Sequence, residues 1–94
     1  MNSKIKILLS YHKPDHLFKD EILTPVHAGR FNARQRMDEE DPKFKWLLEN
    51  TIGDDTGDNI SSKNGLYNEM TTVYWAWKNY DKLDNPEYIG FMHY

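Results

Sequence analysis

Two apolar runs, one near each end of the chain, have the length of a buried strand. Residues 5–11 read IKILLSY and stop before His12 and Pro14, and residues 88–94 read YIGFMHY. A short and nearly continuous apolar run is typical of a parallel strand that is covered on both faces. We therefore expect strands at 5–11 and 88–94, and a loop that leaves the first strand at His12.

The chain between these runs begins with weaker patterns. Residues 22–29 read ILTPVHAG and predict an irregular strand, which Pro25 restricts to an edge or a bend. Residues 30–42 are polar and charged without a clean period, and this pattern predicts a mobile excursion. Residues 44–49, FKWLLE, predict a short helical turn or strand that returns to the core.

The longest periodic pattern runs from residue 62 to residue 80. Its apolar residues recur at helical spacing and form one stripe: Leu66, Tyr67, Met70, Val73, Tyr74 and Trp77. We expect one long helix with this stripe against the core, which leaves Trp75 as the exposed tryptophan. The order of elements predicts an α/β fold with a short parallel sheet and one long helix. Such a sheet keeps unpaired edges, so we expect the remainder of a larger domain or a self-associating copy to cover it.

Composition excludes several classes of function. The chain has 94 residues, enough for one small domain, with 12 basic and 15 acidic side chains and a net charge of −3. The basic residues are scattered, so the sequence predicts no nucleic-acid surface. Cysteine is absent, which rules out disulfides, thiolate metal ligands and a cysteine nucleophile. The N-terminal apolar run is too short to span a membrane, and we expect a soluble, cytoplasmic protein.

Residues 52–65, IGDDTGDNISSKNG, are rich in Asp, Asn, Ser and Gly, and three interpretations compete. A calcium loop needs Gly at its sixth and Glu at its twelfth position; counted from Asp54, these positions hold Asn59 and Gly65. A phosphate loop needs a glycine-rich motif that the segment lacks, and its aspartates would repel phosphate. The pattern favours a solvated turn followed by residues that cap the next helix: Ser61, Ser62 and Asn64.

Histidines stand at the ends of both predicted terminal strands. Ligands of open α/β sheets bind outside the carboxyl ends of the strands. If the two strands are parallel neighbours, His12 and His93 face one crevice together with Tyr11 and Lys13. For each histidine taken singly, an ordinary surface or core position is favoured over a role in ligand binding. Glu69 is either an acceptor for a sugar hydroxyl or a carboxylate that the dipole of a helix N-terminus favours.

Four stretches of the sequence, in this order, resemble a known family. They are IKILLSYHKP, ILTPVHAGR, IGDDTGDNISSKNGLYNEMTTVYWAWKN and EYIGFMHY. They are similar to the N-terminal portion of bacterial capsular and exopolysaccharide synthesis proteins, long described as a domain of unknown function, whose members include galactofuranosyltransferases of O-antigen synthesis. The resemblance covers nearly the whole chain. It implies that residues 1–94 are the N-terminal part of a truncated glycosyltransferase domain that is inactive alone.

The resemblance also implies a Rossmann-like core of the GT-A type. Such a protein uses a nucleotide sugar, here expected to be a UDP-sugar, and a glycan acceptor. His93 is the implied catalytic residue, as an acid/base or a phosphate contact. The residues implied to bind the nucleotide sugar are Tyr11, His12, Lys13, Asp55, Asp58, Asn59, Ser62, Lys63, Asn64 and Glu69. The last strand ends without an Asp-x-Asp, so no metal ligands are assigned and the need for a divalent cation stays open.

Two further expectations concern the setting of the protein. The full-length protein is expected to work at the inner face of the membrane, as a peripheral rather than a spanning protein. The alternative to an enzyme is a non-catalytic carbohydrate-binding or assembly module. In that hypothesis Trp75, beside Trp77 and neighbouring tyrosines, supplies a flat surface on which sugars stack.

Overall fold

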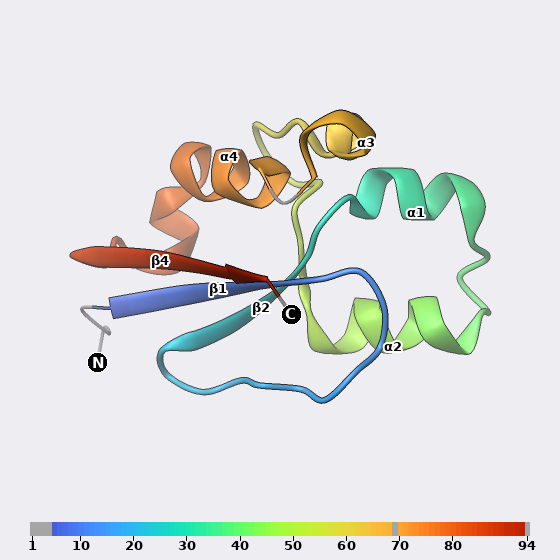
Figure 1. The fold of residues 1–94 in the computed structure, drawn as a ribbon, viewed down its shortest axis with the longest axis horizontal. Coiled ribbons are helices and arrows are strands. Elements are labelled where there is room, and N and C mark those ends of the chain that lie inside the picture. The colour runs from blue at the N-terminus through green and yellow to red at the C-terminus, as the bar shows by residue number, and fades with distance from the viewer. Residues whose placement is uncertain (1–4, 69, 94) are drawn as a thin grey trace.

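The computed structural model describes residues 5–68 and 70–93, the last of them by its backbone, and it contains one parallel sheet (Figure 1). The strands are β1 (Ile5–Tyr11), β2 (Leu23–His27), β3 (Ile52–Gly53) and β4 (Tyr88–His93). Their order across the sheet is β3-β2-β1-β4, and every neighbouring pair is parallel. The expected α/β fold with a short parallel sheet is confirmed.

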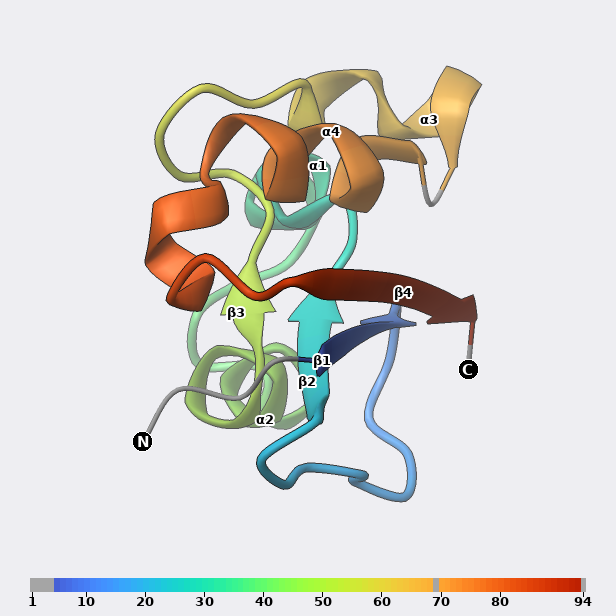
Figure 2. The ribbon, with the colours of Figure 1, turned by 90° about the vertical axis from the view of Figure 1, so that its left-hand side faces the viewer.

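Helices cover both faces of this sheet. They are α1 (Arg30–Arg36), α2 (Pro42–Asn50), α3 (Asn64–Tyr67) and α4 (Met70–Lys78), with 3₁₀ turns η1 (Ser61–Lys63) and η2 (Tyr80–Leu83). Figure 2 shows α4 on one side of the sheet and α2 on the other. The chain places β2 and β3 on one side of β1 and β4 on the other. The strand order therefore reverses between β1 and β4, which is the point where open α/β sheets bind ligands.

The alternation of side chains along β1 builds a core on each face of the sheet. Leu8 packs with Val26 and Trp75 on the side of α4. Leu9 packs with Tyr11 and Leu47 on the side of α2. A strand that contributes to two cores needs apolar residues at successive positions, and this explains the continuous apolar run at its place in the sequence.

Pro25 lies inside the sheet rather than at its edge. It is opposite Leu9 in the β1–β2 register, and β2 has β3 as its second neighbour. The Ala28 N–H donates to the Tyr11 carbonyl, so, with the alternation of N–H directions along a strand, position 25 faces β3. Pairing with β3 starts only at Val26. The missing N–H of proline therefore breaks no ladder hydrogen bond.

The polar segment at 30–42 contains helical structure, which its lack of a clean period did not predict. Its first half is α1, and its end begins α2. The Asp41 carboxylate accepts a hydrogen bond from the Lys43 N–H at 2.8 Å, and Pro42 occupies the first turn of α2. Asp before Pro is a strong helix start. These two residues were the signal in the sequence for the helix that follows.

The long helix expected at 62–80 is divided, and its apolar stripe faces outward. Asn68 ends α3 with a φ of 51° and a ψ of −131°. Leu66, Met70 and Trp77 are 80%, 56% and 67% exposed, whereas Trp75 is 1% exposed. The assignment of Trp77 to the core and Trp75 to the surface is therefore wrong.

A different face of α4 packs on the sheet because its residues are small or hydrogen-bonded. Thr71, Thr72, Trp75 and Ala76 are its buried residues. The Ser10 hydroxyl donates to Thr72 Oγ1 at 3.2 Å, and the Trp75 indole N–H donates to Thr56 Oγ1 at 2.9 Å. Threonine hydroxyls with partners can be buried at little cost.

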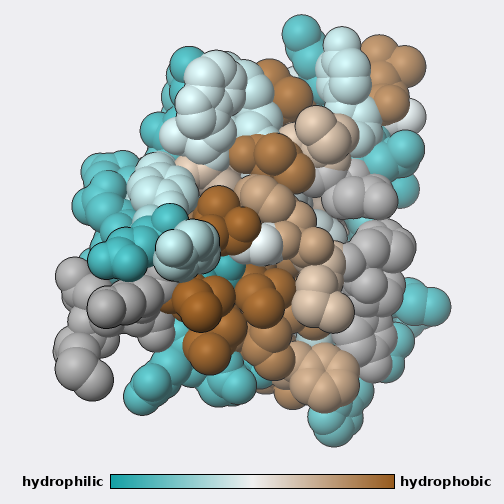
Figure 3. All heavy atoms as spheres, turned by 60° about the vertical axis from the view of Figure 1, so that its left-hand side comes forward, coloured by the Kyte–Doolittle hydropathy of each residue, from teal (hydrophilic) through white to brown (hydrophobic). Residues whose placement is uncertain are grey.

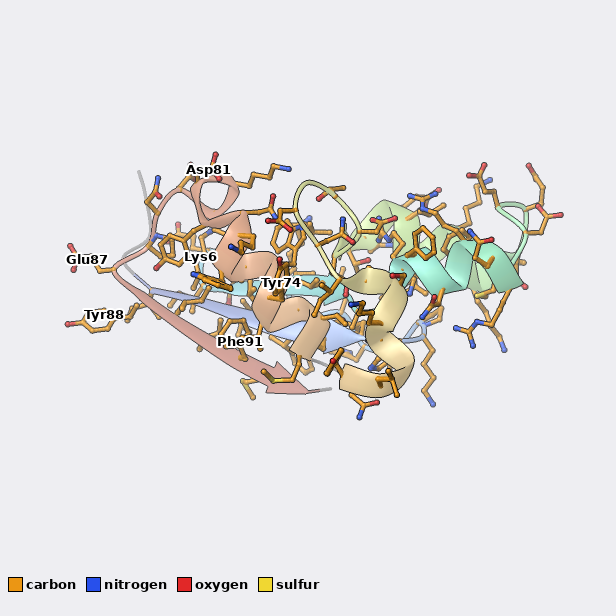
Figure 4. All side chains as sticks on the ribbon, turned by 90° about the horizontal axis from the view of Figure 1, so that it is seen from above. Lys6, Tyr74, Asp81, Glu87, Tyr88 and Phe91 are labelled. Atoms are coloured by element: carbon orange, nitrogen blue, oxygen red, sulfur yellow. The ribbon has the colours of Figure 1, made fainter. Side chains whose placement is uncertain are left out.

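The outward stripe makes α4 and β4 an apolar surface. Figure 3 shows apolar residues gathered across the middle of the face seen there. A hollow in this surface is lined by Ile60, Tyr67, Met70, Val73, Tyr74 and Trp77. In Figure 4 Tyr88 points outward at the edge of the sheet, whereas Phe91 lies on the side of α4. Large exposed apolar areas are uncommon on isolated small proteins.

Candidate functional site

The carboxyl ends of the strands meet at one edge of the sheet. Ser10 is opposite His93 in the β1–β4 register, Tyr11 is opposite His27, and His27 is opposite Gly53. At the right-hand end of the sheet in Figure 1, the loop after β1, the start of α1 and the turn α3 lie around this edge. The first and last strands are parallel neighbours, which is the arrangement that would bring His12 and His93 to one crevice.

Asp54 is the best-connected side chain at this edge, and it is fully buried. Its carboxylate accepts hydrogen bonds from the Gly29 N–H at 2.8 Å and the Arg30 N–H at 3.2 Å. It also accepts from the Ser61 hydroxyl at 2.6 Å and the Thr71 hydroxyl at 2.7 Å. One carboxylate thus joins the starts of α1, η1 and α4 to the end of β3. Hydrogen bonds to a charged group are the strong ones, and Asp54 is therefore a structural residue.

Arg30 and His27 form a second buried network under the same edge. The Arg30 Nε–H donates to His27 Nδ1 at 3.1 Å, and Nη2 donates to the Leu47 and Thr51 carbonyls at 2.9 and 3.1 Å. Burial, and next the positive charge of Arg30, lower the pKa of His27 to about 3. His27 is thus neutral at pH 7, and its Nδ1 serves as an acceptor.

His12 and Lys13 follow β1 and are exposed at the carboxyl edge. His12 lies close enough to His27 that its charge contributes to the lowered pKa of that residue. Tyr11 is different, because its ring is buried and its hydroxyl donates to the His16 carbonyl at 2.8 Å. That hydroxyl also accepts from the Phe18 N–H at 3.1 Å. Tyr11 holds the loop after β1 and turns its side chain toward α2 rather than toward the edge.

The aspartates and Asn59 that sequence reasoning singled out point to protein partners. Asp55 accepts a hydrogen bond from the Arg34 Nε–H at 2.9 Å. Asp58 accepts from the Tyr74 hydroxyl at 3.0 Å, and this hydrogen bond raises the pKa of Tyr74. The Asn59 side chain accepts from the Ser61 N–H at 3.1 Å. Asp58 therefore lies beside the middle of α4 rather than at the strand ends.

The end of the same segment does return to the carboxyl edge. The Ser62 carbonyl accepts a hydrogen bond from the Asn32 side chain of α1 at 3.2 Å. The Asn64 amide donates to the Asn68 carbonyl at 2.7 Å and to Thr71 Oγ1 at 3.0 Å. A Cβ on Gly29 would come within 2.6 Å of Asn64, so this turn sits directly on the start of α1. Ser62 and Lys63 remain exposed there.

Two implied site residues fall outside what can be placed. Glu69 is not among the described residues, and the side chain of His93 is not described. The backbone of His93 ends β4 next to Ser10. His12 and Lys13 therefore lie after β1, whereas Ser62 and Asn64 lie against the start of α1, which follows β2. The side chains of Tyr11, Asp58 and Asn59 are held by other parts of the chain.

Protein partners occupy the carboxylates of Asp54 and Asp55. Asp54 is saturated by four hydrogen bonds, and Asp55 pairs with Arg34. Within residues 5–68 and 70–93, no three His, Asp or Glu side chains converge as a metal ligand set would. The described residues instead offer cationic side chains, Lys13 and Lys63, at the exposed edge.

A model of one protein family matches residues 6–94. Its description is "Domain of unknown function (DUF4422)". The chain belongs to this family. None of the curated proteins matches the chain.

The present chain is also similar to a solved structure. It is the apo structure of WbbM, a bifunctional glycosyltransferase, with 42% sequence identity and a TM-score of 0.73. The match covers 99% of the present chain and 14% of the WbbM chain. The present chain is thus similar to a small part of WbbM, which is a much longer protein. The two matches support a glycosyltransferase-related family and the α/β fold.

One structural finding concerns membranes. Among the helices of the described part of the chain, none combines the length and the apolar character needed to cross a bilayer.

Proposed function

We propose that this chain is part of a glycosyltransferase that takes its sugar from a nucleotide donor, with a UDP-sugar as the expected donor. The observation that carries the proposal is the reversal of the strand order between β1 and β4. It occurs in a chain whose sequence is 42% identical to part of a bifunctional glycosyltransferase. Nucleotides bind outside the carboxyl ends of strands at such a reversal. The donor would lie over His12, Lys13 and the turn at Ser62 to Asn64.

The chemistry of transfer requires that the departing nucleoside diphosphate be stabilised as its negative charge grows. Preorganised cations and N–H groups are the general means of doing this. In the proposal Lys13 and Lys63 carry that role, and His12 contacts a phosphate or the ribose. Because the aspartates are bound to protein partners, no step is assigned to a metal ion.

His93 and Glu69 complete the proposed site. The backbone position of His93, at the end of β4, adjoins the point of strand reversal. This position suits an acid/base group or a phosphate contact. Glu69 is proposed to accept a hydrogen bond from a sugar hydroxyl.

The wider setting follows from the sequence resemblance and is part of the same proposal. The chain would serve capsule, exopolysaccharide or O-antigen synthesis in the cytoplasm, at the inner membrane surface. It would be the N-terminal part of its catalytic domain and inactive alone. The apolar surface of α4 and β4 would be covered by the remainder of that domain or by a second copy, since Trp77 and Tyr88 are 67% and 68% exposed.

A titration tests the donor site. The ¹⁵N-labelled chain is titrated with UDP, UDP-glucose and UDP-galactose, each with and without manganese, while backbone amide shifts are followed. The expected result is a set of saturating shifts at His12, Lys13 and Lys63 that UDP alone reproduces in part. The absence of such shifts with every nucleotide would refute the proposal.

A second function is favoured by the exposure of Trp77. Its ring is 67% exposed, packs edge-on against Tyr74 at 5.8 Å between centroids, and lies 4.0 Å from Lys78 Nζ. Exposed aromatic rings form platforms on which sugar rings stack. We propose a carbohydrate-binding module as the alternative, with Trp77 in place of Trp75. In the same titration, an oligosaccharide that shifts the Trp77 indole while nucleotides shift nothing would select it.

A further inference from the structure

A shallow groove of about 360 Å³ lies between α1 and α3, beside the candidate donor site. Its lining consists of Asn32, Gln35 and Arg36 from α1 and of Asn64 and Gly65 from α3. Residues three and four apart share one face of a helix, so the three α1 side chains form one wall. The volume is at the lower end of the range for ligand sites. The groove offers amide and guanidinium groups and no apolar side chain.

The two walls are held at a fixed separation. Asn64 donates from its Nδ2 to the Asn68 carbonyl and to Thr71 Oγ1, and its side chain lies against Gly29 at the start of α1. Asn32 donates to the Ser62 carbonyl across the groove at 3.2 Å. A binding site whose polar groups are already positioned loses less entropy when a ligand binds.

Gly65 has no explanation within the chain itself. It lies in α3, where glycine is less favourable than alanine. Its φ is not in the left-handed region, unlike those of Gly29 and Gly57. A Cβ built on Gly65 would meet no heavy atom of the described residues within 4 Å, so nothing in that part of the chain excludes a side chain there. Close approach of a ligand to the backbone is one of the uses of glycine, and it would account for a glycine at this position.

We propose that the groove binds one ring of a hydroxyl-rich saccharide, with the ring against the backbone of Gly65. The amide side chains of Asn32 and Gln35 can both donate and accept hydrogen bonds, and Arg36 supplies further donors, which matches the mixed character of sugar hydroxyls. Among the described residues that line the groove there is no aromatic side chain on which a nucleotide base could stack. If the proposed function holds, on which this assignment rests, the saccharide is the acceptor, and the groove lies next to its donor.

The test uses three neutral disaccharides as probes: maltose, galactobiose and mannobiose, each titrated at millimolar concentration into the ¹⁵N-labelled chain. At least one probe is expected to shift the Gly65 amide and the side-chain amides of Asn32 and Gln35. The variant Gly65→Ala is expected to weaken that binding about tenfold or more, as an added methyl group in a contact site can do. Its melting temperature should stay equal or rise, because alanine favours the helix.

A matched glycine provides the control. A Cβ on Gly90, in β4, would meet only Ile7 at the ordinary distance of 3.5 Å. Gly90→Ala is expected to leave saccharide binding unchanged. Equal binding by Gly65→Ala and the wild type, or no shift at the groove with all three probes, would overturn the proposal.

The same spectra separate this inference from the donor assignment. Shifts at His12 and Lys13 with UDP, but none at the groove with the disaccharides, would overturn the saccharide groove and leave the proposed function intact. Groove shifts with a disaccharide and no response to any nucleotide would overturn the proposed function and keep the groove as a saccharide site. Arg36→Ala provides an independent check, because it removes donors from the groove without touching α3.

Discussion

At the scale of residues, one carboxylate organises the carboxyl edge of the sheet. Three aspartates lie close together in the sequence, and their environments differ completely: Asp54 is buried among four donors, whereas Asp58 is exposed with Tyr74 as its partner. The sequence shows three similar acidic residues in a polar segment. The distinction depends on donors from Gly29, Arg30 and Thr71, which are distant in the chain, and local patterns do not reveal them.

Asp54→Asn tests this structural role. The substitution keeps the shape, removes the charge and turns one acceptor atom into a donor that faces other donors. We expect the free energy of unfolding to fall by roughly 3 kcal/mol. Urea denaturation followed by circular dichroism gives the value. Asp58→Asn, at an exposed position, should change it by less than about 0.5 kcal/mol, and equal losses in both variants would contradict the role given to Asp54.

His27 predicts a pH dependence of stability. Its pKa is about 3 in the folded chain against 6.5 for an ordinary histidine, because burial and Arg30 disfavour its charged form. Between these values the unfolded chain binds a proton that the folded chain does not. Stability is therefore complete above pH 6.5 and falls as the pH drops toward 3, by up to about 1.4 kcal/mol per pH unit.

Denaturation at several pH values isolates this contribution when the wild type is compared with His27→Gln. Glutamine keeps an acceptor for the Arg30 Nε–H and has no titrating group. The difference between the two proteins should change with pH below 6.5 and be constant above it. A difference that does not depend on pH would show that His27 does not titrate as described.

At the scale of elements, the hydrophobic pattern predicted the terminal strands correctly and predicted the wrong buried face for the helix α4. The apolar runs at β1 and β4 are both strands. For β1 the run is continuous because the strand packs into a core on each face of the sheet, which requires apolar residues at successive positions. The stripe from Leu66 to Trp77 is also real, yet it faces outward. Periodicity identifies an apolar face, but the face that packs on the sheet is the one with Thr71, Thr72 and Ala76. The hydroxyls of the two threonines form hydrogen bonds with buried partners.

The two tryptophans of α4 form a matched pair for this point. Trp75 is 1% exposed and Trp77 is 67% exposed. Trp75→Ala should lower the free energy of unfolding by roughly 3–5 kcal/mol, since it leaves a cavity in the core next to Leu8 and Val26. Trp77→Ala should change it by about 0.5 kcal/mol or less. Chemical denaturation measures both, and a larger loss for Trp77→Ala would reverse the assignment of faces.

At the scale of the whole molecule, the sheet brings together residues that are far apart in the chain. The sequence was sufficient to predict a strand before His12 and a strand that ends near His93, and the structure adds that β1 and β4 are neighbours. It was not sufficient to predict that Tyr11 turns under the loop or that Asp58 and Asn59 bind elsewhere. The direction of a side chain depends on the layers above and below the sheet, and these layers form from segments with weak patterns.

The affinity for UDP of variants at the carboxyl edge tests the central claim most directly. Isothermal titration calorimetry compares the wild type with Lys13→Ala, Lys63→Ala and the control Lys45→Ala, whose side chain is exposed on α2. The account predicts that UDP binds the wild type, that each edge variant loses about tenfold in affinity and that the control loses none. Equal affinities in all four proteins, or no UDP binding by the wild type, would contradict a nucleotide site at this edge.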